Sequence, residues 1–352
     1  MDNRWSDQAA RDCVRELAPR WGEALALRTY SSRLLGQDPR LVLHGGGNTS
    51  VKLERPDLSG RSVAVVCVKG SGLNLATIDP AGHVALELEP LRRLRTLTRL
   101  ADAAMVNALR RQLLDTTAPN PSIEALLHAF LPAPYIDHTH ADAILALTNR
   151  DQGAVAVAEA LGGTVALLDY VHPGFELARA VADVVAGTPD LQGVVLGHHG
   201  LITWGDSARA SYDRHIELVG RAEAWLRRKG ASPAAAVDRD PAAVRSRFRE
   251  LAPRLRGLLA LPSGSPDRPR RRVILQHLVT LEILELLDRS GARELLVTPP
   301  PDHRSPDPHQ ESAPVVRGPG AVRGGSGCLW SGLSGLLVPP SAPGRGGGGR
   351  LR

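Results

Sequence analysis

The stretch that most constrains this chain is Asp137-His138-Thr139-His140-Ala141-Asp142, in which a threonine separates two histidines. Residues two apart on an extended strand project from the same face, so both imidazoles can reach one metal ion. An apolar run follows from Ala143 to Leu147, which predicts a site where a buried strand becomes a helix. The alternative is a pair of strand-end histidines that bind no metal.

A second histidine group, Gly197-His198-His199-Gly200, follows about sixty residues later, after the apolar run 194–196. Three neutral imidazoles with an open fourth position form a common type of catalytic zinc site. The spacing therefore favours a metal centre. An unrelated histidine pair in a glycine-flanked turn is the other interpretation.

Two glycine-containing loops each follow an apolar stretch. The first loop is His44-Gly45-Gly46-Gly47-Asn48-Thr49-Ser50, after a strand expected over 41–43. The second is Lys69-Gly70-Ser71-Gly72, after a strand expected over 63–68. Glycine lets the backbone approach a ligand closely, so the two loops together could hold an anionic group such as phosphate. The ending of a P-loop is absent, and two ordinary tight turns explain the pattern about equally well.

Glu124 lies near the start of a short helix that we expect to begin at Ser122, a residue type favoured at the N-cap, and to run to Phe130. The helix dipole favours a carboxylate in this first turn. From the residues alone, a surface glutamate that complements the dipole is a simpler interpretation than a catalytic group.

Short apolar strands and amphipathic helices alternate along the first 230 residues, which predicts an α/β layered domain. Further strands are expected over 164–168 and 194–196. Further helices are expected over 7–35, 91–114, 175–185 and 207–228.

Composition narrows the class of protein. Hydrophobic residues make up 43% of the 352 residues and charged residues 23%, as is typical of a soluble globular protein. The net charge of +6 is spread along the chain without a basic stripe interleaved with aromatics, which argues against a nucleic-acid partner. Three dispersed cysteines, no apolar leader and no long apolar run predict a cytoplasmic location and no membrane span.

The order of these motifs resembles that of the class II aldolase/adducin family, in particular the aldolase half of the bifunctional rhamnulose-1-phosphate aldolase/alcohol dehydrogenase proteins. The resemblance covers about residues 20–230 and implies a three-layer α/β fold with a central β-sheet between helices. It is carried by HGGGNTSVK (44–52), VKGSGLNLATI (68–78), PSIEALLHAFLP (121–132), DHTHADAILALTN (137–149) and GHHGLITWG (197–205).

The resemblance also implies roles for individual residues. It aligns His138, His140 and His199 with the family's zinc ligands, Glu124 with its catalytic acid/base, and Asn48, Ser71, Gly72 and Ser122 with the positions that hold the substrate phosphate. The residue next to the third ligand, His198, is then a neighbour of the metal and not a ligand.

The implied reaction is zinc-dependent cleavage of a ketose 1-phosphate, L-rhamnulose 1-phosphate, to dihydroxyacetone phosphate and L-lactaldehyde. Zn²⁺ acts as a Lewis acid for the enediolate charge, and Glu124 moves protons with a pKa that we expect burial to raise. The resemblance further implies a homo-oligomer, a homotetramer among relatives, that works on a small phosphorylated sugar in rhamnose catabolism.

Other functions remain open at this level. The same scaffold serves sugar-phosphate 4-epimerases and dehydratases, whose ligands are alike. A non-catalytic, adducin-like binding module is a different class, although the presence of Glu124 and the three histidines argues against it. An inactive fragment is the third alternative.

We expect three segments: a class II aldolase/adducin-type domain over 1–230, a helical extension over 231–298 and a disordered tail over 299–352. Of the last 54 residues, 22 are Gly or Pro, and such a composition buries too little apolar surface to fold. In the bifunctional relatives a dehydrogenase domain would begin at this tail. We therefore hypothesise a frameshifted or truncated reading frame.

Overall fold

The computed structural model describes residues 1–57, 59–229, 241–271, 273–275 and 283. The chain divides into two compact units, whose described parts are 1–229 and the residues from 241 onward. The tail expected over 299–352 lies outside the described residues, and the three segment boundaries remain a prediction.

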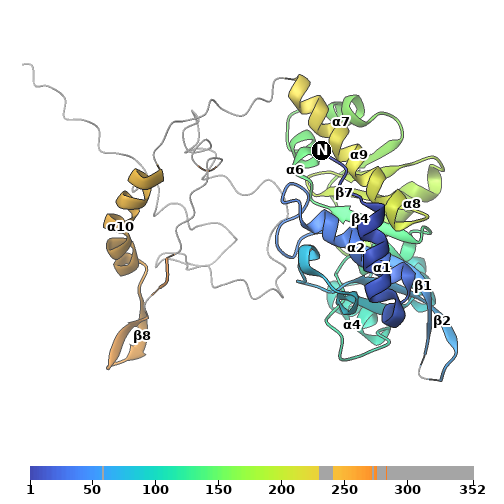
Figure 1. The fold of residues 1–352 in the computed structure, drawn as a ribbon, viewed down its shortest axis with the longest axis horizontal. Coiled ribbons are helices and arrows are strands. Elements are labelled where there is room, and N and C mark those ends of the chain that lie inside the picture. The colour runs from blue at the N-terminus through green and yellow to red at the C-terminus, as the bar shows by residue number, and fades with distance from the viewer. Residues whose placement is uncertain (58, 230–240, 272, 276–282, 284–352) are drawn as a thin grey trace, which may run out of the picture. The chain divides into compact units, whose positions relative to one another are not determined.

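The first unit is built on a seven-stranded sheet with the strand order β3-β2-β1-β4-β7-β6-β5 (Figure 1). Neighbouring strands are antiparallel except β5 and β6, which are parallel. The strands are β1 (Asn48–Pro56), β2 (Ser62–Lys69), β3 (His83–Glu87), β4 (Tyr135–Thr139), β5 (Val165–Leu168), β6 (Gly193–Leu196) and β7 (Gly200–Gly205).

Helices cover both faces of this sheet. They are α1 (Asp7–Trp21), α2 (Glu23–Gly36), α3 (Leu88–Arg93), α4 (Asp102–Arg111), α5 (Ala125–Phe130), α6 (Asp142–Thr148), α7 (Gly153–Leu161), α8 (Phe175–Gly187) and α9 (Ala208–Arg228). Successive strand residues alternate between the faces: Val194 and Leu196 pack in the core beside α5 and α8, whereas Val195 packs beside α9. The predicted layered α/β fold with a central sheet between helices is confirmed.

Three predicted elements are wrong. Residues 41–43 form no strand: Leu41 and Val42 are buried in the core, but the segment does not pair with the sheet. The helix expected over 7–35 is two helices separated at Gly22, whose φ of +84° is incompatible with a continuous helix. The helix expected over 91–114 is broken between α3 and α4, and Leu97, which lies in the break, is 39% exposed.

The second unit contains α10 (Pro241–Leu258) and a two-stranded antiparallel sheet, β8 (Leu261–Ser265) and β9 (Arg268–Arg271). The described part of the extension that we expected to be helical therefore contains strands as well as a helix. Among the residues that the structure describes, no helix is both long enough and apolar enough to cross a membrane.

A buried ion pair joins α2 to the centre of the sheet. Arg28 and Asp137 are both 0% exposed, and Arg28 Nη2 donates to Asp137 Oδ1 at 2.5 Å. Arg28 Nη1 also donates to the carbonyl oxygens of Ser50 and Ile136, each at 3.4 Å, and Ser211 Oγ of α9 donates to Asp137 Oδ2 at 2.5 Å. One pair of charges thus connects α2, β1, β4 and α9.

We predict that Asp137→Asn lowers the free energy of unfolding by about 3–5 kcal/mol, because it leaves the Arg28 charge buried without its partner. The double variant Arg28→Met/Asp137→Asn should recover part of this loss. The matched control is Glu89→Gln, which breaks the exposed Arg92–Glu89 pair and should cost less than about 1 kcal/mol. Urea unfolding measures all three, and equal losses for the buried and exposed pairs would contradict the prediction.

A buried histidine on the same face makes the fold sensitive to acid. His215 of α9 is 0% exposed, and its Nε2 and Nδ1 lie 2.7 Å and 2.8 Å from the hydroxyl oxygens of Thr139 and Thr203. Burial lowers the pKa of His215 to about 4, although Asp137 acts in the opposite direction. The folded protein therefore keeps this imidazole neutral where an unfolded chain would protonate it.

Between pH 6.5 and about 4, the unfolded chain binds a proton at His215 that the folded chain does not. We therefore predict that the free energy of unfolding falls as the pH drops through this window, by about 3 kcal/mol in total from this group. His215→Gln should flatten the dependence. Urea titrations at several pH values test this, and an unchanged slope in the variant would refute it.

Candidate functional site

Three predicted metal ligands come together at the end of β4. His138 is in β4, His140 follows the strand, and His199 lies in the turn between β6 and β7. One ring nitrogen from each lies within 4.8 Å of the others, and the Nε2 atoms of His138 and His140 are 3.2 Å apart. Two nitrogens bound to one tetrahedral zinc ion lie about 3.3 Å apart, so the spacing of this pair fits such an ion.

The backbone around the histidines explains how they meet. Gly200 begins β7, and a Cβ at this position would lie 2.1 Å from the carbonyl oxygen of Thr139. Glycine thus permits the close approach that carries His199 toward His138. A carbonyl oxygen can only accept, so the contact of 3.1 Å from His138 Nδ1 to Leu201 O puts the hydrogen on Nδ1. The lone pair of Nε2 is then available to a metal.

The predicted acid/base, Glu124, lies against two of the histidines. It occupies the N-cap of α5, so the helix begins later than expected, and Ser122 Oγ accepts from the Glu124 backbone N–H at 3.3 Å. Glu124 is 6% exposed; its Oε2 lies 3.5 Å from His138 Nε2 and its Oε1 lies 3.5 Å from His199 Nε2. The surface-glutamate interpretation is therefore wrong.

The two oxygens of Glu124 have different surroundings. Oε2 accepts a hydrogen bond of 2.6 Å from Asn48 Nδ2, whereas Oε1 is buried with no hydrogen-bond partner among the described residues. Burial raises the pKa of Glu124, but His138, His199, the Asn48 hydrogen bond and the charge of Lys69 outweigh burial, and the pKa lies below its usual value. The expectation that burial leaves Glu124 with a raised pKa is therefore wrong.

The four residues expected to hold phosphate lie on two neighbouring segments. Asn48 Nδ2 of β1 lies 3.2 Å from Ser122 Oγ, so these two side chains are in contact. Ser71 and Gly72 lie in the loop after β2, which is joined to the segment before α5 by a hydrogen bond from Ser71 N to Asn120 O at 2.7 Å.

Lys69, to which the sequence assigned no role, connects the two glycine-containing loops. Its side chain is nearly buried, at 2% exposed, at the end of β2. Nζ donates to Gly45 O at 2.7 Å and to Leu73 O at 2.9 Å. One positive charge therefore lies between the two loops. A positive charge at this position would attract an anionic group.

Sequence reasoning missed one buried member of the site, His128. It lies four residues after Glu124 in α5, is 0% exposed, and its ring nitrogens contact Asn48 and Ser50. Residues four apart lie on the same face of a helix. That spacing could have identified His128 as a neighbour of Glu124.

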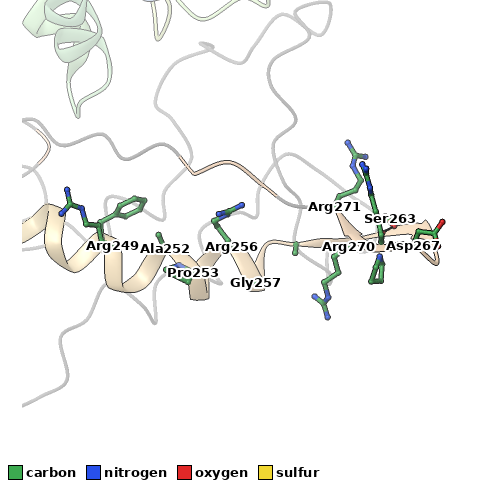
Figure 2. Close-up of a pocket in the computed structure, with 13 residues that line it drawn as sticks. Arg249, Ala252, Pro253, Arg256, Gly257, Ser263, Asp267, Arg270 and Arg271 are labelled. Carbon is green, nitrogen blue, oxygen red and sulfur yellow. Dashed lines mark hydrogen bonds between the residues drawn. The ribbon is translucent and has the colours of Figure 1, made fainter.

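The second unit has a hollow of its own, about 1230 Å³ in volume, between α10 and the β8–β9 hairpin (Figure 2). None of the predicted site residues lies in it. Its charged lining consists of five arginines and one carboxylate: Arg249, Arg256, Arg268, Arg270, Arg271 and Asp267.

Comparison with known proteins agrees with this geometry. The family model of the class II aldolase and adducin N-terminal domain matches residues 28–226. The uncharacterized oxidoreductase YuxG of Bacillus subtilis (strain 168) is 39% identical over 197 residues, which are 56% of this chain and 29% of that protein. The chain thus spans less than a third of this relative's length.

A solved structure is also similar: the N-terminal class II aldolase domain of a conserved protein from Thermoplasma acidophilum. It is 40% identical, with a TM-score of 0.58, and the likeness covers 64% of this chain and 99% of that one. Because the family model matches more than half of the sequence, the chain belongs to the class II aldolase and adducin family.

We predict that Zn²⁺ raises the melting temperature of the wild-type protein and of His198→Asn, but not of His199→Asn. His199 is in the three-histidine group, whereas the His198 ring contacts Asn149 and is not in that group. Asparagine also tolerates the φ of 57° at residue 198. Thermal unfolding with and without Zn²⁺ tests this linkage. Loss of the shift in His198→Asn, or its retention in His199→Asn, would contradict the ligand assignment.

Proposed function

We propose that this protein is a zinc-dependent aldolase that cleaves L-rhamnulose 1-phosphate to dihydroxyacetone phosphate and L-lactaldehyde. The observation that supports the proposal most directly is the group of three imidazole nitrogens with the Glu124 carboxylate 3.5 Å from two of them. Membership of the class II aldolase and adducin family supports metal-assisted chemistry on a small molecule.

In this proposal His138, His140 and His199 hold the metal. Zinc bound there would supply a Lewis acid that stabilises the negative charge developed during carbon–carbon cleavage. The Glu124 carboxylate takes the proton from the C4 hydroxyl, the C3–C4 bond breaks, the aldehyde leaves, and the electron pair of that bond remains on the three-carbon fragment. Glu124 delivers the proton that this fragment takes up at C3.

The substrate phosphate would bind between the glycine-containing loops. Asn48, Ser71, Gly72 and Ser122 supply donors from side chains and backbone, and the charge of Lys69 lies beside them. Burial of this charge makes it electrostatically more effective than a surface lysine. We further propose that the protein acts in the cytoplasm as a homo-oligomer on phosphorylated sugars, without nucleic-acid or membrane partners.

We predict that the purified chain contains zinc and releases dihydroxyacetone phosphate from L-rhamnulose 1-phosphate, measured by coupling to an NADH-dependent glycerol-phosphate dehydrogenase. A chelator should abolish release and added Zn²⁺ should restore it. Glu124→Gln should lower kcat by about 10²–10⁴-fold, the usual contribution of a positioned acid/base, while the zinc content stays unchanged.

The substrate is tested by running other ketose 1-phosphates and a pentulose 5-phosphate in parallel. An epimerised or dehydrated sugar in place of dihydroxyacetone phosphate would contradict the aldolase assignment and identify another reaction of the scaffold. A folded, zinc-loaded chain that turns over none of these sugars would refute the proposed function.

A further inference from the structure

His128 is buried beside the candidate site, and the proposed reaction gives it no role. Its Nδ1 lies 2.8 Å from Ser50 Oγ, and its Nε2 makes a short contact with Asn48 Oδ1. Asn48 in turn donates from Nδ2 to Glu124 Oε2 at 2.6 Å. The four side chains thus form one continuous hydrogen-bonded chain, Ser50–His128–Asn48–Glu124, away from solvent.

The direction of each hydrogen bond in this chain follows from the carboxylate at its end. An ionised carboxylate can only accept, so the Asn48 amide must present its NH₂ group to Glu124 and its carbonyl oxygen to His128. That oxygen also can only accept, so the hydrogen of the neutral imidazole is on Nε2. Nδ1 then accepts from the Ser50 hydroxyl. Burial holds the pKa of His128 well below its usual value, in keeping with a neutral ring.

We propose that His128 is a positioning residue that sets the orientation of the Asn48 amide, so that its NH₂ group holds Glu124 Oε2 and keeps the carboxylate in place. This inference rests on the proposed function. Oε2 is occupied by the Asn48 NH₂ group, whereas Oε1 accepts no hydrogen bond among the described residues and faces His199. Asn48 thus holds the carboxylate by one of its two oxygens.

The opposite orientation of Asn48 shows what His128 contributes. If the amide rotated by half a turn, its carbonyl oxygen would face the Glu124 carboxylate and its NH₂ group would face the imidazole N–H. Both contacts would then be repulsive. Without His128, only the contacts of Asn48 Nδ2 with Glu124 Oε2 and Ser122 Oγ would oppose this rotation. The imidazole N–H removes that freedom.

Two substitutions at residue 128 separate positioning from packing. His128→Gln keeps an N–H donor that can reach Asn48 Oδ1, whereas His128→Leu has a similar volume and no donor. We expect His128→Leu to lower kcat about tenfold or more, part of the effect of a positioned acid/base, with KM changed less than about threefold. His128→Gln should recover most of kcat, and both variants should retain the wild-type zinc content.

The tautomer of His128 gives a readout that needs no substrate. A long-range ¹H–¹⁵N NMR spectrum of the histidine-labelled chain should show the Nε2–H form, and Ser50→Ala, which removes the donor to Nδ1, should weaken that preference and lower kcat. If His128→Leu does not fold, Ser50→Ala and His128→Gln carry the kinetic comparison.

An Nδ1–H tautomer in the wild-type protein would overturn the inference, as would equal kcat values for His128→Leu and His128→Gln. If the wild-type chain cleaves no sugar phosphate, the proposed function is refuted, but the inference about His128 can still be tested. The tautomer then decides alone whether His128 orients Asn48: the Nε2–H form supports it and the Nδ1–H form excludes it.

Discussion

The buried ion pair between Arg28 and Asp137 is the interaction on which the site depends. Removing two charges from water is costly, and the cost is offset only when the geometry is good and the remaining hydrogen-bonding groups are satisfied. Here the partners come from α2, β1, β4 and α9 at once, although Arg28 Nε is buried without a hydrogen-bond partner among the described residues. Any shift of β4 against these neighbours would break several of these contacts together. Because His138 directly follows Asp137, the ion pair also determines where the imidazole of this candidate metal ligand lies.

The two faces of β4 carry different tasks because side chains alternate along a strand. Asp137 and Thr139 point toward α2 and α9, where they meet Arg28 and His215. His138 points to the other face, toward Glu124 at the start of α5. Stability and chemistry therefore rest on adjacent residues with separate surroundings. Substitutions on the first face test the fold, whereas substitutions on the second test the site.

Much of the fold could be predicted from local patterns. The strand at 63–68, the strand before the second histidine pair, and the helix capped by Ser207 lie close to where the apolar spacing indicated them. The order and direction of the strands could not be predicted, because pairings such as Asn48 with His138 join residues 90 apart in the chain. Apolar spacing also failed across Gly22, since two separate helices can face the same core with one continuous pattern.

The candidate ligands and Glu124 could be named from motifs, but their chemical state could not. Burial raises the pKa of Glu124, and the net lowering comes first from His138 and His199 and then from Asn48 and Lys69. The last two reach the site through strand register and loop contacts and leave no mark in the sequence around residue 124. His128 could not be predicted for the same reason, because its role depends on which residues of β1 lie opposite α5. A motif contains the reacting groups themselves. The partners that orient those groups are determined by the register between strands and by the helices packed on them. A structure is therefore needed to find the partners that orient a carboxylate that a motif alone can identify.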